Sequence, residues 1–159
     1  MKQLSKPIQP CLWFDHHAED AALFYTSIFP NSKIESISRY GKEGFEFHGK
    51  PEGSVLTVSF TINGQPYTAL NGSPEFIFNE AISLQVFCDN QEEIDFYWEK
   101  LCEGGEESMC GWLKDKYGLS WQIVPSILPE LMSNPEKSGK VTLAFLQMKK
   151  FDLATLLKV

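Results

Sequence analysis

The side chains best suited to nucleophilic or metal chemistry are scattered along this sequence. Cys11 and Cys110 are the best nucleophile candidates, but neither has a neighbouring histidine or basic residue that would favour the thiolate. None of the cysteines has the close spacing of a zinc site, so we interpret them as reduced, buried thiols. No P-loop, G-x-S-x-G or H-E-x-x-H motif occurs, and we predict no cofactor. The cysteines are Cys11, Cys88, Cys102 and Cys110, and the histidines, which we interpret as solvated, are His16, His17 and His48.

A β-hairpin is predicted at Cys110–Pro125, with its turn at Asp115–Gly118 and its end at Pro125. The second strand alternates between an apolar face and a mixed face that carries an amide. The mixed face belongs to an active site, a binding cup or a satisfied interior, depending on the elements around it. The two sets are Leu119, Trp121 and Ile123, and Ser120, Gln122 and Val124.

The first half of the chain predicts a strand, a helix and three further strands. Apolar residues at three- and four-residue spacing predict one buried helical stripe after Asp15, whose carboxylate we expect to cap the helix. Asn63-Gly64 is the preferred pair for a type I′ turn. The predicted segments are a strand at Ile8–Phe14, the helix to Phe29, a strand at Ser32–Tyr40, an exposed loop at Gly41–Gly53, and a hairpin of Val55–Ile62 and Gln65–Asn71.

The same order of elements repeats in the second half. A strand at Ala81–Cys88 precedes a helix that Asn90 is expected to cap, and the opening hairpin follows. The helical pairs Phe24-Tyr25 and Phe96-Tyr97 are 72 residues apart, whereas the glycines of the two hairpin turns are 54 apart. A repeated strand–helix–strand–strand–strand unit is a far more specific signal than any single element.

The repeat predicts a single domain over residues 1–159, with modules at about 8–72 and about 81–125 and a helical tail at about 126–159. Each module alone is too small to bury much apolar surface, so the modules must pack together or against another chain. We therefore expect a homodimer. The apolar tail, with Asp152 as a predicted cap, docks either on the domain's own sheet or on a partner subunit.

Composition excludes several classes of partner. The 159 residues are 43% hydrophobic and carry a net charge of −7, which disfavours binding to nucleic acid. No stretch reaches the roughly 18 apolar residues of a membrane span. The first residues lack the apolar core of a signal peptide, so we expect a cytoplasmic protein.

Several sequence blocks resemble the PhnB-like branch of the vicinal oxygen chelate superfamily, which includes glyoxalase I, extradiol dioxygenases and bleomycin-resistance proteins. Members of that branch carry the label 3-demethylubiquinone-9 3-methyltransferase. The resemblance implies an α+β fold in which two βαβββ modules form a curved mixed-sheet cup. The blocks are Cys11–Asp15, Ala69–Gly72, Phe78–Ser83, Tyr97–Leu101 and Cys110–Pro125.

Metal-dependent members of that superfamily place His, Glu or Gln at inward positions of the first and fourth strands of each module. Matching the hairpin glycines puts Thr68 and Gln122 at the fourth-strand positions, and the first strands offer only weak ligands. Hard divalent ions prefer imidazole or carboxylate. We therefore predict a cup without metal. The first-strand candidates are Gln9, Cys11, Trp13, Ser83 and Gln85.

The resulting hypothesis is a cup that binds an unidentified small molecule by aromatic stacking and amide hydrogen bonds. The alternative is a lyase, isomerase or dioxygenase-like enzyme of the superfamily with an atypical metal site, and a structural or regulatory subunit is a third possibility. Methyl transfer is disfavoured, because no glycine-rich nucleotide turn is present. The predicted binding residues are Cys11, Trp13, Thr68, Asn71, Phe78, Gln85, Trp112 and Gln122.

Overall fold

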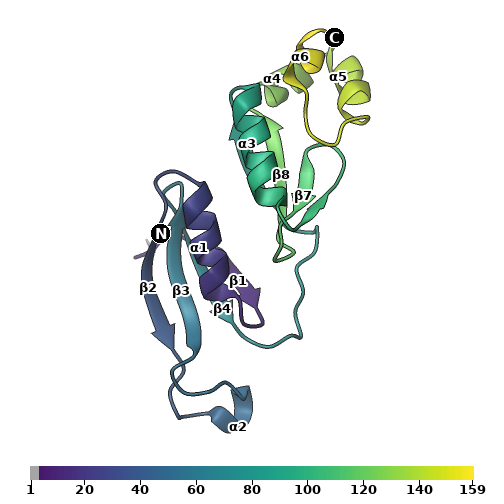
Figure 1. Ribbon diagram of the computed structural model, residues 1–159. Helices are drawn as coiled ribbons and strands as arrows, with labels where there is room; N and C mark the ends of the chain where they lie inside the picture. Colours follow the sequence, from purple (N-terminus) through teal and green to yellow (C-terminus); the bar gives the residue numbers. More distant parts are fainter. Residues whose placement is uncertain (1–3) are drawn as a thin grey trace. The chain divides into compact units, whose positions relative to one another are not determined.

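The computed structural model describes residues 4–159, and the chain divides after Ile77 into two compact units. Each unit contains a four-stranded mixed sheet with a long helix on one face (Figure 1). Strand–helix–strand–strand–strand therefore occurs twice, which confirms the predicted α+β fold of two βαβββ modules.

The first unit holds β1 (Cys11–Phe14), α1 (Ala18–Ile28), β2 (Lys33–Arg39), α2 (Phe45–His48), β3 (Val55–Ile62) and β4 (Gln65–Asn71). The second holds β5 (Leu84–Cys88), α3 (Gln91–Cys102), β6 (Glu106–Glu107), β7 (Trp112–Lys114), β8 (Ser120–Pro125), α4 (Leu128–Ser133), α5 (Ser138–Phe145) and α6 (Leu153–Leu157). Strands β1 and β5 are shorter than predicted, and the predicted loop at Gly41–Gly53 contains the short helix α2.

The two sheets share one topology. Their strand orders are β1-β4-β3-β2 and β5-β8-β7-β6. The first strand of each module runs parallel to the last, and the remaining pairs are antiparallel. Consequently the first and fourth strands lie side by side, with Cys11 opposite Thr68 and Gln85 opposite Gln122.

The β3–β4 hairpin has the predicted turn and register. Asn63 and Gly64 both have positive φ, at 46° and 79°, as a type I′ turn requires. The turn pairs Ile62 with Gln65, so that Phe60 lies opposite Tyr67 on the buried face. Because a shift of one residue would turn the apolar side chains to the other face, this turn fixes which side of the sheet is buried.

The start of α1 differs from the prediction. The helix begins at Ala18, and Asp15 does not cap it; the Asp15 carboxylate instead contacts Lys50 Nζ at 3.3 Å. Asn71, at the end of β4, supplies the cap, because its Oδ1 accepts a 2.8 Å hydrogen bond from the Ala18 N–H. An amide from a neighbouring strand thus satisfies a helix-terminal donor, as any first turn requires.

The two modules are equivalent at an offset other than the predicted 72. The helical positions that are buried against the sheet correspond as Tyr25 with Trp98 and Ile28 with Leu101, 73 residues apart. Tyr97 is only half-buried, so it is not the counterpart of the fully buried Tyr25. The two Phe-Tyr pairs therefore have the same residue types but do not occupy equivalent positions in the two modules.

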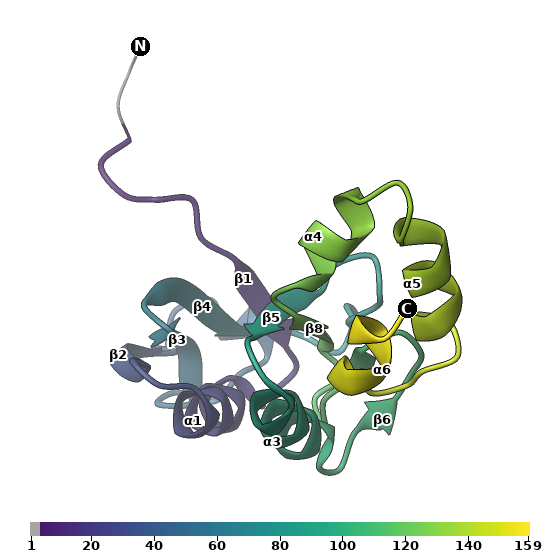
Figure 2. The ribbon, with the colours of Figure 1, turned by 90° about the horizontal axis from the view of Figure 1, so that it is seen from above.

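The tail docks on the second module. The backbone N–H groups of Cys110 and Gly111 donate to the carbonyls of Met148 and Lys149, both at 2.7 Å. Gln91, in the first turn of α3, donates to the Phe151 carbonyl at 3.1 Å. The tail therefore contacts its own module, and Figure 2 shows α4, α5 and α6 grouped around this unit.

Asp152 caps α6 as predicted, accepting from the Thr155 N–H at 2.6 Å. Asn90 likewise caps α3 by accepting from the Glu93 N–H at 2.9 Å.

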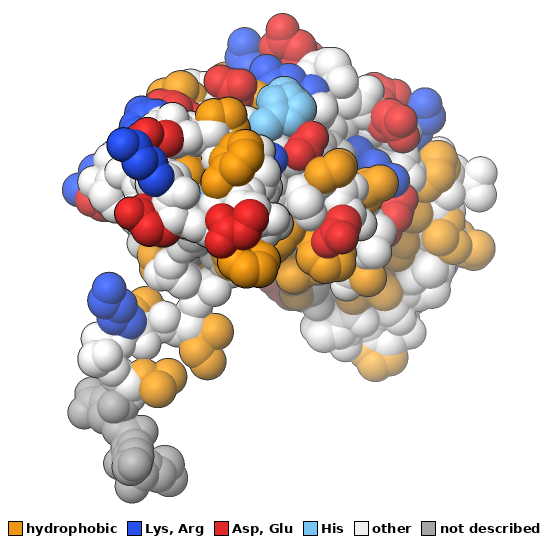
Figure 3. All heavy atoms as spheres, turned by 90° about the horizontal axis from the view of Figure 1, so that it is seen from below, with side chains coloured by type: hydrophobic (Ala, Val, Ile, Leu, Met, Phe, Trp, Pro, Cys, Tyr) orange, Lys and Arg blue, Asp and Glu red, His pale blue; other side chains and the backbone are white. Residues whose placement is uncertain are grey.

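Among residues 4–159, no helix is both long and apolar enough to cross a membrane. Acidic and basic side chains are interspersed over the face shown in Figure 3.

Candidate functional site

One face of the second sheet gathers polar and aromatic side chains. Strands β7 and β8 pair Trp112 with Gln122 and Lys114 with Ser120, and paired residues lie on the same face of a sheet. The intervening residues, Leu113 and its neighbours on β8, are buried in the core of the module. We call the face that carries Trp112, Lys114, Ser120 and Gln122 the outer face.

A turn built around Asp115 holds this face in register. Asp115 is only 2% exposed, and its Oδ1 accepts from the backbone N–H groups of Tyr117 and Leu119 at 2.8 and 3.1 Å. Its Oδ2 accepts from Trp121 Nε1 at 2.8 Å. The Asp115 carboxylate therefore joins the turn, which lies between Lys114 and Ser120, to the core of the module. This agrees with the predicted hairpin turn at this segment.

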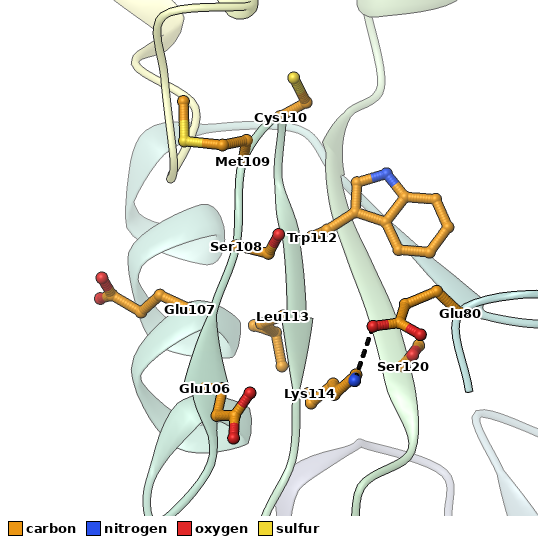
Figure 4. Close-up of a pocket in the computed structure, with 10 residues that line it drawn as sticks. All are labelled: Glu80, Glu106, Glu107, Ser108, Met109, Cys110, Trp112, Leu113, Lys114 and Ser120. Atoms are coloured by element: carbon orange, nitrogen blue, oxygen red, sulfur yellow. Dashed lines mark ion pairs between the residues drawn. The ribbon is translucent and has the colours of Figure 1, made fainter. Parts of the chain in front are cut away.

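A pocket of about 420 Å³ opens along β6 and β7 of this unit (Figure 4). A volume of that size falls in the range of small-molecule sites. In Figure 4 the Lys114 and Glu80 side chains reach toward each other beside Ser120, with the Trp112 indole next to Glu80. The lining residues are Glu80, Glu106, Glu107, Ser108, Met109, Cys110, Trp112, Leu113, Lys114 and Ser120.

Hydrogen bonds favour the ionised forms of Glu80, Lys114 and Glu107. Lys114 Nζ lies 2.6 Å from Glu80 Oε1, and this hydrogen bond lowers the pKa of Glu80 and raises the pKa of Lys114. Hydrogen bonds from Trp98 and then Lys149 lower the pKa of Glu107. The pocket therefore presents carboxylates, rather than carboxylic acids, around neutral pH.

Ser120 is the exceptional polar group of the pocket. Its side chain is fully buried, at 0% exposure, and its hydroxyl has no hydrogen-bond partner in the described part of the chain. A buried hydroxyl without a partner costs about 1–3 kcal/mol. Ser120 also lines the pocket, so the lining contains a buried polar atom without a partner in the described residues.

The predicted amides of the second module come together beside this pocket. Gln85 Nε2 lies 3.4 Å from Gln122 Oε1, and Gln122 Nε2 donates to Ser83 Oγ at 2.7 Å. Trp112 is the cross-strand neighbour of Gln122 and is the one predicted residue that lines the pocket. Phe78 is half-buried in the segment before β5 and lies outside the lining.

The predicted residues of the first module belong to the other unit. The Trp13 indole donates from Nε1 to the Ser73 carbonyl at 2.8 Å and meets Phe76 edge-on at 5.0 Å between ring centroids. Thr68 accepts from Gln9 Nε2 at 2.9 Å, opposite the exposed Cys11.

Both ends of the Asn71 amide are engaged in hydrogen bonds within the first unit. It is 6% exposed, its Oδ1 holds the Ala18 N–H, and its Nδ2 donates to the Val55 carbonyl at 3.1 Å. We therefore assign Asn71 a structural role as a helix cap and leave it out of the candidate site.

The side chains at the superfamily's metal positions do not fit a divalent ion within either module. Those positions carry Cys11 with Thr68 and Gln85 with Gln122, which are neutral or weak ligands for a hard cation. Among residues 4–159, no three His, Cys, Asp or Glu side chains are arranged to hold a metal ion. The chemistry of these side chains is therefore what disagrees with a metal centre.

Cys11, Cys88 and Cys102 are not activated nucleophiles. Burial raises the pKa of the Cys88 thiol to about 12, and it also raises the pKa of Cys11 and of Cys102. A raised pKa keeps a thiol protonated and therefore unreactive at neutral pH. Cys110, which lines the pocket, is half-buried.

Sequence reasoning missed the charged and hydroxyl residues of the pocket. Strand alternation had placed Ser120 with Gln122, and the same alternation across the turn places Lys114 with Trp112. Lys114 directly precedes the predicted turn at Asp115–Gly118 and was not among the predicted binding residues. No local signal connects Glu80 to Lys114, because the contact joins residues 34 positions apart.

The βαβββ module, present twice with the same strand order, is the fold of the vicinal oxygen chelate superfamily. Residues 6–124 match the family described as 3-demethylubiquinone-9 3-methyltransferase, and the chain belongs to that PhnB-like family. A comparison with curated proteins found no match.

Solved structures agree with this assignment. The PhnB protein from Bacillus cereus, which bears the same methyltransferase name, is 39% identical with a TM-score of 0.67, covering 76% of this chain and 99% of its own. Protein PA1353 from Pseudomonas aeruginosa is 18% identical with a TM-score of 0.60, covering 76% and 98%. The fosfomycin resistance protein FosX from Listeria monocytogenes, in complex with Mn(II) and sulfate, is 16% identical with a TM-score of 0.53, covering 82% and 98%, and shows the shared fold.

Proposed function

We propose that this protein is a small-molecule binding protein that holds its ligand on the outer face of the second module without a metal ion. The observation that carries the proposal is the fully buried Ser120 hydroxyl, which has no partner in the described residues and lines a pocket of about 420 Å³. The half-buried Trp112 indole supplies an aromatic surface in the same pocket.

The contacts available are sufficient for measurable affinity. An aromatic side chain buries roughly 150–250 Å², and at about 25 cal/mol per Å² full burial is worth about 4–6 kcal/mol. Trp112 is already half-buried, so a stacked ligand gains only part of this. After the entropic cost of association, millimolar to micromolar dissociation constants are expected.

Binding without metal rests on the chemistry of the strand positions. Gln85 and Gln122 hydrogen-bond each other and Ser83, so their amides are arranged to orient a polar group. Methyl transfer, the activity in the family's name, has no support in these residues: neither module contains the glycine-rich turn after a parallel strand that a nucleotide-type methyl donor uses.

We also propose a homodimer. Strands β1 and β5 each pair on one side only within their sheets, and exposed sheet edges are a common route to association. Phe87 on β5 is 53% exposed, which favours a further apolar partner at this edge. Analytical ultracentrifugation is expected to give twice the 18.1 kDa chain mass, and a monomer at micromolar concentration would contradict the dimer.

The binding function is tested by thermal shift on EDTA-treated protein against a panel of small organic molecules and, separately, divalent ions. We expect at least one organic compound to raise the melting temperature without metal, and Trp112→Ala to abolish that shift. The control variant, Phe47→Ala, changes an 88% exposed ring in α2 of the first unit and should keep the shift. Stabilisation that requires a divalent ion would instead favour the metal-dependent enzyme.

A further inference from the structure

We propose that the ligand of the outer-face pocket is an organic cation, a protonated amine on an apolar stem. This inference rests on the proposed binding function. It concerns the chemical class of the ligand rather than the existence of the site, and three separate features of the pocket carry it.

The first feature is the charge of the lining. Two carboxylates, on Glu80 and Glu106, face the pocket beside a single ammonium group on Lys114, whereas the β6–β7 register places Glu107 with Leu113 on the other face of the sheet. Lys114 is engaged by Glu80 at 2.6 Å, and Glu107 contacts Lys149 at 3.2 Å. Glu106 forms no ion pair within 4 Å in the described part of the chain and shares the charge of Lys114 with Glu80, so two carboxylates outnumber one cation and the pocket keeps a net negative charge.

The second feature is the unpartnered Ser120 hydroxyl beside the ion pair (Figure 4). A protonated amine has several N–H donors and no acceptor, so it can donate to the Ser120 oxygen and to a carboxylate at the same time. Hydrogen bonds from a charged donor are about twice as strong as those between neutral groups. The hydroxyl that is unsatisfied in the free protein is therefore an acceptor of the kind a cation needs.

The third feature is the arrangement of the aromatic and apolar side chains. The Trp112 indole lies next to Glu80, and Met109 and Cys110 lie at the opposite end of the pocket from Lys114 (Figure 4). An indole face attracts a cation placed within about 6 Å of it. A ligand whose ammonium group lies near Trp112 and Glu80 would therefore place its apolar stem against Met109 and Cys110.

An anionic ligand fits the same residues poorly. Lys114 is the only cation in the lining, and Glu80 already neutralises it. A carboxylate or phosphate entering this pocket would displace that ion pair and face the Glu106 carboxylate. Like charges in a partly buried site disfavour each other strongly.

The test is an NMR titration of the full-length chain with three matched probes: phenethylamine, phenethyl alcohol and 3-phenylpropanoate. The readout is the indole N–H signal of Trp112, assigned with Trp112→Phe. We expect phenethylamine at pH 7 to shift this signal with a dissociation constant about tenfold or more below those of the other two probes. Equal or tighter binding of the alcohol or the acid at Trp112 would overturn the inference and leave the binding function standing.

No shift of the Trp112 signal with any probe would count against the pocket itself and would overturn both proposals. Variants separate ligand contacts from folding effects. Glu106→Gln should weaken phenethylamine about tenfold, whereas the control Glu92→Gln, an exposed change on α3 away from the pocket, should not. Ser120→Ala should also weaken the amine while the melting temperature stays the same or rises, because it removes an unsatisfied hydroxyl. Unchanged amine affinity in both pocket variants would contradict the assignment.

Discussion

The Asp115 carboxylate offers the sharpest test of how the hairpin holds the pocket in place. Asp115→Ala removes three hydrogen bonds from buried or half-buried donors, at 2.8, 3.1 and 2.8 Å. A hydrogen bond to a charged group contributes about 1.5–3 kcal/mol, but the variant also avoids burying a charge, so the sum overstates the loss. We expect a destabilisation of about 3–5 kcal/mol, equivalent to a melting temperature lower by about 6–20 °C.

Urea denaturation followed by circular dichroism measures this change. Asp152→Ala is the matched control, since the side chain of that exposed aspartate hydrogen-bonds only Thr155 among the described residues, as a helix cap, and its loss should cost about 0.5–2 kcal/mol. Asp115→Asn should fall between the two, because its Oδ1 can still accept from the turn while its amide N–H₂ opposes the Trp121 N–H. If Asp115→Ala costs no more than Asp152→Ala, the carboxylate does not hold the hairpin and the reasoning fails.

Three further predictions follow from local geometry. Gly111→Ala should destabilise the protein by about 2–4 kcal/mol, because its Cβ would lie 2.4 Å from the Phe151 ring at a residue whose φ is +80°. The control Gly139→Ala in α5 should be neutral or stabilising. Equal urea midpoints for the two variants would contradict the docking of the tail. Cys88, whose burial raises its thiol pKa to about 12, should react with a thiol reagent at pH 8 only after denaturation, as peptide mapping of labelled protein would show; labelling of the native protein would refute this. The affinity for phenethylamine, measured by the NMR titration, should stay constant from pH 7 to about 5 and fall only below that pH. The reason is that Lys114 lowers the pKa of Glu80 from 4.5, and the carboxylate must be ionised to bind a cation. A loss of affinity between pH 7 and 6 would instead implicate a histidine.

The sequence predicted those parts of the fold that depend on neighbouring residues. Asn63-Gly64 specified both the turn and the register of the first hairpin. Alternation along β8 correctly separated the buried Trp121 from Gln122 on the outer face. The caps at Asn90 and Asp152 were also predictable, because each contacts a backbone N–H three residues later.

Contacts between distant residues were not predictable in the same way. Asp15 precedes α1 and has the chemistry of a cap, yet Asn71 takes that role because the parallel pairing of β1 with β4 brings it to the helix start. The Glu80–Lys114 pair likewise depends on how the segment before β5 approaches the second sheet. The misplaced repeat offset has a similar cause: sequence letters matched Tyr25 with Tyr97, whereas burial matches it with Trp98.

The most direct test of the binding function is a crystallographic screen of EDTA-treated protein against a mixture of aromatic amines, acids and neutral compounds. We predict density for an organic molecule in the outer-face pocket, with a polar atom within about 3.2 Å of Ser120 Oγ and an aromatic or apolar part against Trp112. An outer-face pocket that stays empty while compounds bind elsewhere would contradict the account. So would a divalent ion that Gln85 and Gln122 bind when metal is returned.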